Sequence, residues 1–218
     1  MPEVDLLVNY PKSKRNVEAR GQEKTEEDRR IGRLFGKEYF DGERRFGYGG
    51  YKYHPRFWQP VIPSFAQHYH LTKGSSILDV GCGKGFMLHD FAALIPGIKV
   101  CGIDVSPYAI ANALDDMKPF LQIANAKKLP FADKSFDVVI AINTIHNLAL
   151  EDCKGALREI QRVARKGAFV TMDAYRTPEE KIRMDAWNLT ALTYMHVEQW
   201  KALFKEAGYT GDYFWFIP

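Results

Sequence analysis

The sequence contains few cysteines and no long apolar run. Only three of its 218 residues are cysteine, Cys82, Cys101 and Cys153, and they show neither zinc spacing nor a CxxC pair. An odd number of widely separated cysteines predicts reduced thiols and no metal site. No apolar run approaches the ~20 residues that span a bilayer. Acidic residues precede the short apolar patch near the N-terminus, which is the wrong order for a secretory signal. We therefore expect a cytoplasmic protein without a membrane segment.

The sequence also lacks a strong charge imbalance and a phosphate-binding loop. Its 30 basic and 27 acidic residues are interspersed and give a formal net charge of +3. This charge is too small to predict a polyanionic partner, so nucleic acid is not expected to bind. The pattern GxxxxGK[ST] is absent, because Lys84 is followed by Gly85 and Phe86. What is present is 46% hydrophobic content, in a chain long enough for one domain with an appended segment.

From Lys73 onward, apolar strands alternate with amphipathic helices. Strands are predicted over residues 77–80, 100–105, 121–124, 136–142, 168–172 and 213–217. Helices are predicted over residues 86–94, 151–165, 183–194 and 197–207, and another begins at Pro107 after the cap Ser106. This alternation predicts an α/β fold, a doubly wound, mostly parallel Rossmann-like sheet with helices on both faces.

Upstream of Lys73 the chain has a different character. Residues 25–28 form a capping box that starts a helix running to about Gly36, and the residues before it are expected to form a loose arm. Residues 39–58 are dense in aromatics, glycines and arginines, and residues 61–70 indicate a short amphipathic helix. We therefore predict two parts, an N-terminal arm with a helical, aromatic cap (residues 1–72) and a main domain (residues 73–218).

The stretch ILDVGCGKGF places Gly81, Gly83 and Gly85 directly after a strand and at the start of a helix. Backbone N–H groups at such a position can approach a polar ligand closely. Asp104 ends the next strand, where a carboxylate can accept hydrogen bonds from the ribose hydroxyls of an adenosine. Asp79, just before the loop, would repel a pyrophosphate and attract an ammonium group. S-adenosylmethionine, a nucleoside with an ammonium group, therefore fits better than a nicotinamide dinucleotide.

Several further motifs follow in order. ILDVGCGKG, GIDVS, NAKKLPFADKSFDVVIAINTIHNL and LREIQRVARKGAFV resemble the successive motifs of class I S-adenosylmethionine-dependent methyltransferases, of the type 11/25-like kind, over about residues 75–209. The resemblance implies S-adenosyl-L-methionine as cofactor and S-adenosyl-L-homocysteine as product. Members of this family usually end in a β-hairpin, whereas only one strand is predicted after Gly208.

The resemblance also implies which residues bind the cofactor. They are Asp79, Gly81, Cys82, Gly83 and Gly85 at the methionyl part, Asp104 and Val105 at the ribose, Asn125 and Ala126 at the adenine, and Ile142 and Asn143 near the sulfonium.

Methyl transfer mainly requires alignment of an acceptor and exclusion of water, and a base helps when the acceptor must lose a proton. His146 follows the fourth strand at the carboxyl edge of the sheet, and its ordinary pKa near ~6.5 suits proton abstraction. We predict His146 as the catalytic base, the alternative being that it packs against the next helix. The strand end MDAYRT brings Asp173, Tyr175 and Arg176 to the same edge. We predict acceptor binding by Tyr175 and Arg176, although Arg176 could instead be a surface ion-pair partner.

We interpret the aromatic tract as a lid that covers the reactive end of the cofactor and excludes water. The acceptor contacts predicted from it are Tyr39, Arg44, Tyr48, Tyr51 and Arg56. Phe40, Phe57 and Trp58 are predicted to fix the lid by packing.

Three functions are compatible with these patterns. The leading hypothesis is methyl transfer to a small polar or anionic metabolite (carboxylate, phosphate or sugar-containing) by a monomer or homodimer. An alternative is an RNA or protein methyltransferase, in which the arginines of the aromatic tract would follow a polyanion. A further alternative is a non-catalytic, regulatory protein that binds the same cofactor, because fold resemblance alone does not prove turnover.

Overall fold

The computed structural model describes residues 2–11 and 24–218. Its elements in chain order are α2 (Glu26–Gly32), α3 (Lys37–Asp41), α4 (Pro55–Trp58), α5 (Ile62–His68), β1 (Ser76–Val80), α6 (Phe86–Leu94), β2 (Lys99–Asp104), α7 (Pro107–Ala111), η1 (Lys118–Phe120), β3 (Leu121–Ile123), β4 (Phe136–Ile142), η2 (Ile145–Asn147), α8 (Leu150–Val163), β5 (Ala164–Tyr175), α9 (Pro178–Trp187), β6 (Met195–His196), α10 (Val197–Ala207) and β7 (Asp212–Phe216).

These strands form one parallel sheet, as the sequence predicted. Their order is β3-β2-β1-β4-β5-β6, and β7 also pairs with β5. All pairings among the described strands are parallel. The outer edge of β5 pairs first with β7 and then with the two-residue β6. The chain thus ends in a single parallel strand, and Glu3 of the N-terminal arm forms a further bridge to Tyr213 at that edge.

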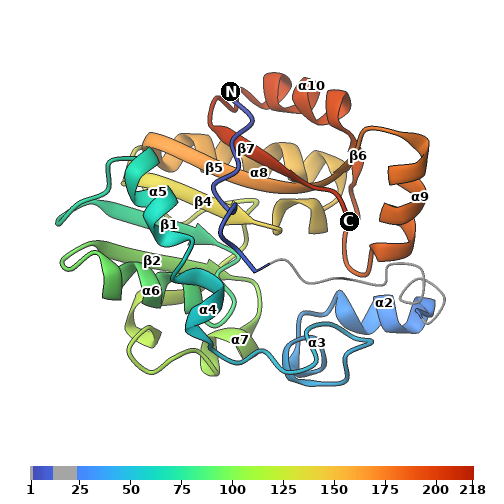
Figure 1. Ribbon diagram of the computed structural model, residues 1–218, viewed down its shortest axis with the longest axis horizontal. Helices are drawn as coiled ribbons and strands as arrows, with labels where there is room; N and C mark the ends of the chain where they lie inside the picture. The colour runs from blue at the N-terminus through green and yellow to red at the C-terminus, as the bar shows by residue number, and fades with distance from the viewer. Residues whose placement is uncertain (1, 12–23) are drawn as a thin grey trace.

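The sheet is covered on both faces, because alternate residues of its central strands are apolar on either side. On one face, Val139 and Val170 pack against α8 and α10. On the other, Ile140 and Phe169 pack against α5, α6 and Leu6 of the arm. In Figure 1 the arrowheads of β1 and β4 point toward the side of the molecule where α2, α3 and α9 lie. The carboxyl ends of the strands, where ligands of such folds bind, therefore face the cap.

The N-terminal arm differs from the sequence-based expectation. Residues 2–11 do not form a loose arm. The backbone N–H of Val4 donates to the carbonyl of Tyr213 at 2.9 Å, and Leu6 is buried. The rest of the expected arm, residues 12–23, lies outside the described residues.

Two other boundaries also differ from the predicted ones. The helix expected over residues 183–194 begins at Pro178, because the Thr177 side chain caps the N–H of Glu180, and it ends at Trp187. The following turn is fixed by the Asn188 side chain, which bonds both backbone groups of Ala191. Strand β5 is twelve residues long and extends beyond the predicted range at both ends.

Helix α5 packs with the main domain rather than with the cap. Val61, Ile62 and Phe65 are at most 1% exposed and belong to the cluster that covers β1 and β4. The ring of Phe65 lies edge-on to that of Phe169, with 5.2 Å between centroids. We therefore propose that the boundary between cap and domain lies near Pro60, within the segment that the sequence assigned to the cap.

Candidate functional site

The loop between β1 and α6 requires glycine at three positions. Gly81, Gly83 and Gly85 have φ values of +87°, +55° and +76°, which L-residues rarely adopt. A Cβ atom at Gly81 would lie 2.2 Å from the hydroxyl oxygen of Thr144, and one at Gly83 would lie 3.2 Å from the ring of Tyr51. The loop is therefore held closely between the turn after β4 and the cap.

Two buried carboxylates, Asp79 and Asp104, flank this loop. Asp104 accepts hydrogen bonds from the backbone N–H groups of Gly83 and Ser106, both at 2.8 Å. Asp79 is 6% exposed, and none of the described residues donates a hydrogen bond to its carboxylate. Burial, together with the neighbouring charge of Asp104, raises the pKa of Asp79 to about 7. The site thus contains negative charge without a compensating cation among the described residues.

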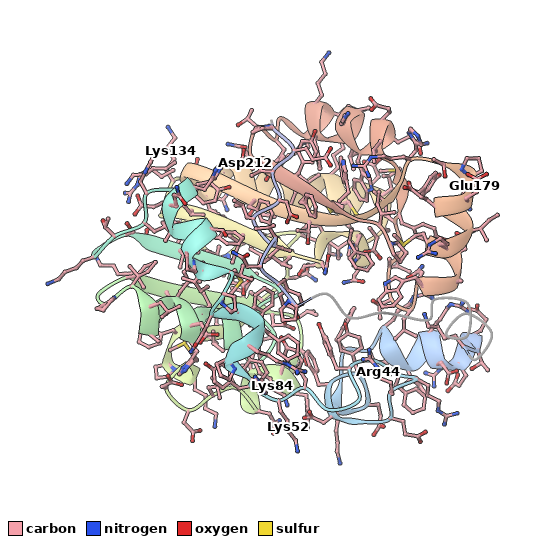
Figure 2. All side chains as sticks on the ribbon, viewed as in Figure 1. Arg44, Lys52, Lys84, Lys134, Glu179 and Asp212 are labelled. Atoms are coloured by element: carbon pink, nitrogen blue, oxygen red, sulfur yellow. The ribbon has the colours of Figure 1, made fainter. Side chains whose placement is uncertain are left out.

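The one lysine of the loop is directed away from these carboxylates. Lys84 donates to both carboxylate oxygens of Asp41 in α3, at 2.9 and 2.7 Å, and to the carbonyl of Tyr51 at 2.9 Å. Asp41 also accepts from the hydroxyl of Tyr108 at 2.7 Å. Burial alone would raise the pKa of Asp41, but the hydrogen bonds from Lys84 and Tyr108 hold it below its usual value. Figure 2 labels Lys84 beside the cap.

Aromatic side chains of the cap cover the glycine loop. The ring of Tyr51 stacks on that of Phe86, with centroids 4.7 Å apart, and lies 4.3 Å from that of Tyr48. Phe40 is buried and contacts both tyrosines. The Ser106 hydroxyl donates to the carbonyl of Phe35, which ties the cap to the loop after β2 as well. The cap therefore packs against both the loop after β1 and the loop after β2.

The other residues expected to bind cofactor lie along the same edge. Cys82 is buried, and burial raises the pKa of its thiol well above the usual range. Asn143 directly follows β4 with φ +52°, and its N–H donates to the hydroxyl of Thr171 at 2.7 Å. The remaining four are Val105, which is 49% exposed, Asn125, whose amide oxygen accepts from the N–H of Lys127, and the partly buried Ala126 and Ile142.

Two of the three arginines expected to bind an acceptor, Arg44 and Arg176, form polar contacts within the protein, although all three are exposed. Arg44 donates to the carbonyls of Gly47 and Tyr48 in its own loop (Figure 2). Arg176 forms an ion pair with Glu3 at 2.7 Å. The guanidinium of Arg56 lies 4.7 Å from the ring centroid of Phe57 and is exposed.

The predicted tyrosines lie in two groups. Tyr39 and Tyr48 contact each other in the cap, with ring centroids 5.2 Å apart, and Tyr51 is next to them. Tyr175 lies at the end of β5, 5.8 Å from the ring of His196. As predicted, Phe40 packs inside the cap. Phe57 and Trp58 are half-buried against Tyr10 of the arm.

His146 is buried at the carboxyl end of the sheet, next to Asp173. Its Nδ1 accepts a hydrogen bond from the backbone N–H of Asp173 at 3.0 Å and lies 3.6 Å from the carboxylate of that residue. Burial lowers the pKa of His146 and raises that of Asp173.

One residue near this pair had no signal in the sequence. The ammonium of Lys24 donates to the carbonyls of Trp187 and Asn188, at the C-terminal end of α9, and its charge opposes the increase in the pKa of Asp173. A helix C-terminus attracts cations. Lys24 is 162 or more positions away from the end of α9, so the sequence could not show that the two meet.

The described part of the chain contains no group of three or more potential metal ligands and no helix that is long and apolar enough to cross a membrane.

Comparison with known proteins gives a consistent picture. Residues 78–172 match the sequence model of the methyltransferase domain family. A tRNA (carboxymethyluridine(34)-5-O)-methyltransferase of Arabidopsis thaliana is 30% identical over 143 residues, which are 65% of this chain and 33% of that protein. A demethylmenaquinone methyltransferase of Symbiobacterium thermophilum is 33% identical over 136 residues, 58% of this chain and 53% of that protein. The chain thus spans between a third and about half of the length of these two relatives.

A solved structure shares the fold. The crystal structure of a [4+2]-cyclase superimposes with a TM-score of 0.56 at 26% identity, covering 69% of this chain and 56% of the other.

Proposed function

We infer that the chain belongs to the class I S-adenosylmethionine-dependent methyltransferase superfamily, and from this premise we propose that it binds S-adenosylmethionine and methylates a small polar acceptor. The observation that carries the proposal is the buried, uncompensated Asp79 beside the glycine loop. An ammonium group would pair with this carboxylate, and Asp104 would accept from the ribose hydroxyls. Bound S-adenosylmethionine would supply a methyl carbon that is already activated by a positive sulfur.

The remaining cofactor contacts follow the sequence-based assignment. We propose that Gly81, Cys82, Gly83 and Gly85 enclose the methionyl part. Val105, Asn125 and Ala126 would line the nucleoside, and Ile142 and Asn143 the sulfonium. Because the cap residues Phe40 and Tyr51 pack on the loop, they would keep water from the reacting atoms.

For the acceptor, a neutral polar molecule is favoured over the anionic classes that the sequence left open. Arg44 bonds backbone carbonyls of its own loop and Arg176 pairs with Glu3 at the surface. The edge of the sheet where an acceptor would bind contains the buried carboxylate of Asp173. A carboxylate or phosphate acceptor would meet repulsion there. The proposed acceptor contacts are Tyr39, Tyr48, Tyr51 and Tyr175. We also propose that the acceptor is a small molecule, that the protein is a monomer or a homodimer, and that it is located in the cytoplasm.

The alternative of an RNA acceptor has one observation in its favour, the similarity to a protein named as a tRNA methyltransferase. In that case methyl transfer to RNA would decline steeply with added salt, whereas transfer to a neutral small molecule would not. A regulatory role without turnover would give cofactor binding and no transfer to any acceptor fraction.

The decisive experiment measures binding first and transfer second. We expect S-adenosylmethionine and S-adenosylhomocysteine to bind in isothermal titration calorimetry and to raise the unfolding temperature, while NAD does neither. Methyl-labelled S-adenosylmethionine is then incubated with fractionated metabolites and, separately, with total RNA. The proposal would be refuted if NAD bound and neither S-adenosylmethionine nor S-adenosylhomocysteine did.

A further inference from the structure

Two polar groups at the carboxyl end of β5 make no hydrogen bond with the described residues and keep a small surface accessible to solvent. They are Nε2 of His146 and the carboxylate of Asp173, in residues that are 4% and 7% exposed. The carboxylate of Asp173 lies 3.6 Å from Nδ1 of His146, which is too long for a hydrogen bond. Because both groups have unused hydrogen-bonding capacity and accessible surface, a molecule bound at this edge of the sheet could pair with them.

The hydrogen bond at Nδ1 determines where the proton of His146 lies. Nδ1 accepts from the backbone N–H of Asp173, so it carries no proton of its own. In the neutral ring the proton must then be on Nε2. Burial lowers the pKa of His146 and so keeps the ring neutral. His146 consequently presents a donor at Nε2, which is the opposite of what a general base requires.

The backbone of Asp173 is fixed on both sides, which gives its side chain a defined position. Its N–H donates to His146, and its carbonyl accepts from the indole N–H of Trp200 at 3.0 Å.

The strand register aligns Asp79 with Ile140 and Ile140 with Phe169, so Phe169 and Asp79 share one face of the sheet. Asp173 is four residues after Phe169 and therefore lies on that same face, nearer the carboxyl edge. Asp79 and Asp173 therefore lie on the same face of the sheet.

We propose that Asp173 takes the proton from the methyl acceptor and that His146, through Nε2–H, holds an oxygen of the acceptor next to it. This assignment rests on the proposed methyltransferase function. In the step, the acceptor O–H bond breaks, its proton moves to a carboxylate oxygen of Asp173, and the electron pair stays on the acceptor oxygen. The proton is later released to water. The pair fits a neutral molecule with a hydroxyl group beside a carbonyl or ether oxygen.

The charges around Asp173 are compatible with this role. The groups that face it are His146 from the turn after β4 and Lys24 from the segment before α2. Burial raises the pKa of Asp173, and His146 and Lys24 oppose that increase, so the carboxylate is a stronger base than an exposed one yet stays ionisable.

The first test needs no acceptor. With ring-¹⁵N-labelled histidine, nuclear magnetic resonance of the whole chain, alone and with S-adenosylhomocysteine, reports which nitrogen of His146 carries a proton. We expect the neutral Nε2–H form throughout pH 6–8. A proton on Nδ1, or an imidazolium at pH 7, would overturn the assignment whether or not the protein transfers methyl groups. Failure to bind S-adenosylhomocysteine would instead remove the proposed function, which keeps the two failures separate.

The second test compares variants in transfer to the active metabolite fraction. Asp173→Asn should lower kcat at least 100-fold and remove the acid limb of the pH profile, with KM for S-adenosylmethionine within threefold. His146→Gln, which retains a side-chain N–H donor, should lose no more than tenfold. Asp133→Asn, at an exposed carboxylate paired with Arg162 at the opposite edge of the sheet, is the matched control. The assignment would be contradicted if Asp173→Asn kept the full kcat. It would also be contradicted if His146→Gln lowered kcat as much as His146→Ala does. Affinity for S-adenosylhomocysteine confirms that each variant is folded.

Discussion

At the scale of single residues, Asp79 carries an electrostatic cost that only a cationic ligand would offset. Its pKa in the fold is about 7 against an ordinary value of 3.8, so folding carries the full cost of ionising Asp79 above pH 7, and this cost disappears as the pH falls toward 4. This difference corresponds to roughly 4 kcal/mol at most. We expect Asp79→Asn to raise the free energy of unfolding of the ligand-free protein by about 2–4 kcal/mol at pH 8, with a smaller gain at pH 5.

The same substitution should weaken S-adenosylmethionine binding at least tenfold, because the ammonium group loses its partner. Urea unfolding at several pH values and calorimetric titration measure the two effects. Asp137 provides a control of opposite sign. Burial opposes its ionisation, but Arg165 and the Ser76 N–H hold its pKa well below the usual range, so Asp137→Asn should destabilise the fold at pH 7. A destabilised Asp79→Asn variant at pH 8 would contradict the argument.

At the scale of elements, the ion pair between Lys84 and Asp41 couples α3 of the cap to the glycine loop. The Lys84 ammonium is buried, and breaking one partner of such a pair leaves an uncompensated charge. A double-mutant cycle with Lys84→Met and Asp41→Asn should therefore give a coupling energy of about 1–3 kcal/mol in urea unfolding. Glu27 and Arg30, an exposed pair at 2.7 Å on α2, supply the matched control cycle, in which no coupling above experimental error is expected. Additive effects at Lys84 and Asp41 would show that the cap is not held through this pair.

Elements of the main domain could be predicted because their signals are local. Helix α6 and strand β4 have the predicted boundaries, since an apolar run and its flanking turn residues are contiguous in sequence. The two-residue β6 was missed because it exists only through pairing with Ala174 and Tyr175. Residues 2–11 were expected to be loose. Their contact with β7 could not be predicted, because that strand is about 200 positions away in sequence.

In the candidate site, too, features with a local sequence signal could be predicted and features that depend on distant contacts could not. The glycine loop and Asp104 follow from motif and strand position, whereas the proton position of His146 depends on a backbone N–H 27 residues away. A pattern that brings a histidine to the correct edge therefore cannot decide whether it donates or accepts. The pairing of Arg176 with Glu3 is a second example, since the sequence allowed a surface ion pair at Arg176 but could not identify a partner 173 positions away.

At the scale of the whole molecule, the packing of α5 predicts where the cap can be removed. A chain that begins at Lys73 lacks Val61, Ile62 and Phe65, which belong to the same core cluster as Phe91 and Phe169. Phe65 contacts both of these rings. Losing large core side chains costs about 2–5 kcal/mol each, so three losses reach the total stability of a typical domain. A chain that begins at Pro60 keeps α5 and loses mainly the contacts of the cap and arm.

We therefore expect the Pro60 chain to unfold cooperatively, to bind S-adenosylhomocysteine with reduced affinity and to lack methyl transfer, because the lid of Phe40 and Tyr51 is absent. The Lys73 chain should show no cooperative transition, since the apolar surface of α6 and β5 would be exposed to water. Circular dichroism melts and calorimetric titration of both chains distinguish these outcomes. Cooperative unfolding of the Lys73 chain would place residues 61–72 with the cap after all, and methyl transfer by the Pro60 chain would show that the cap does not contribute to the reaction.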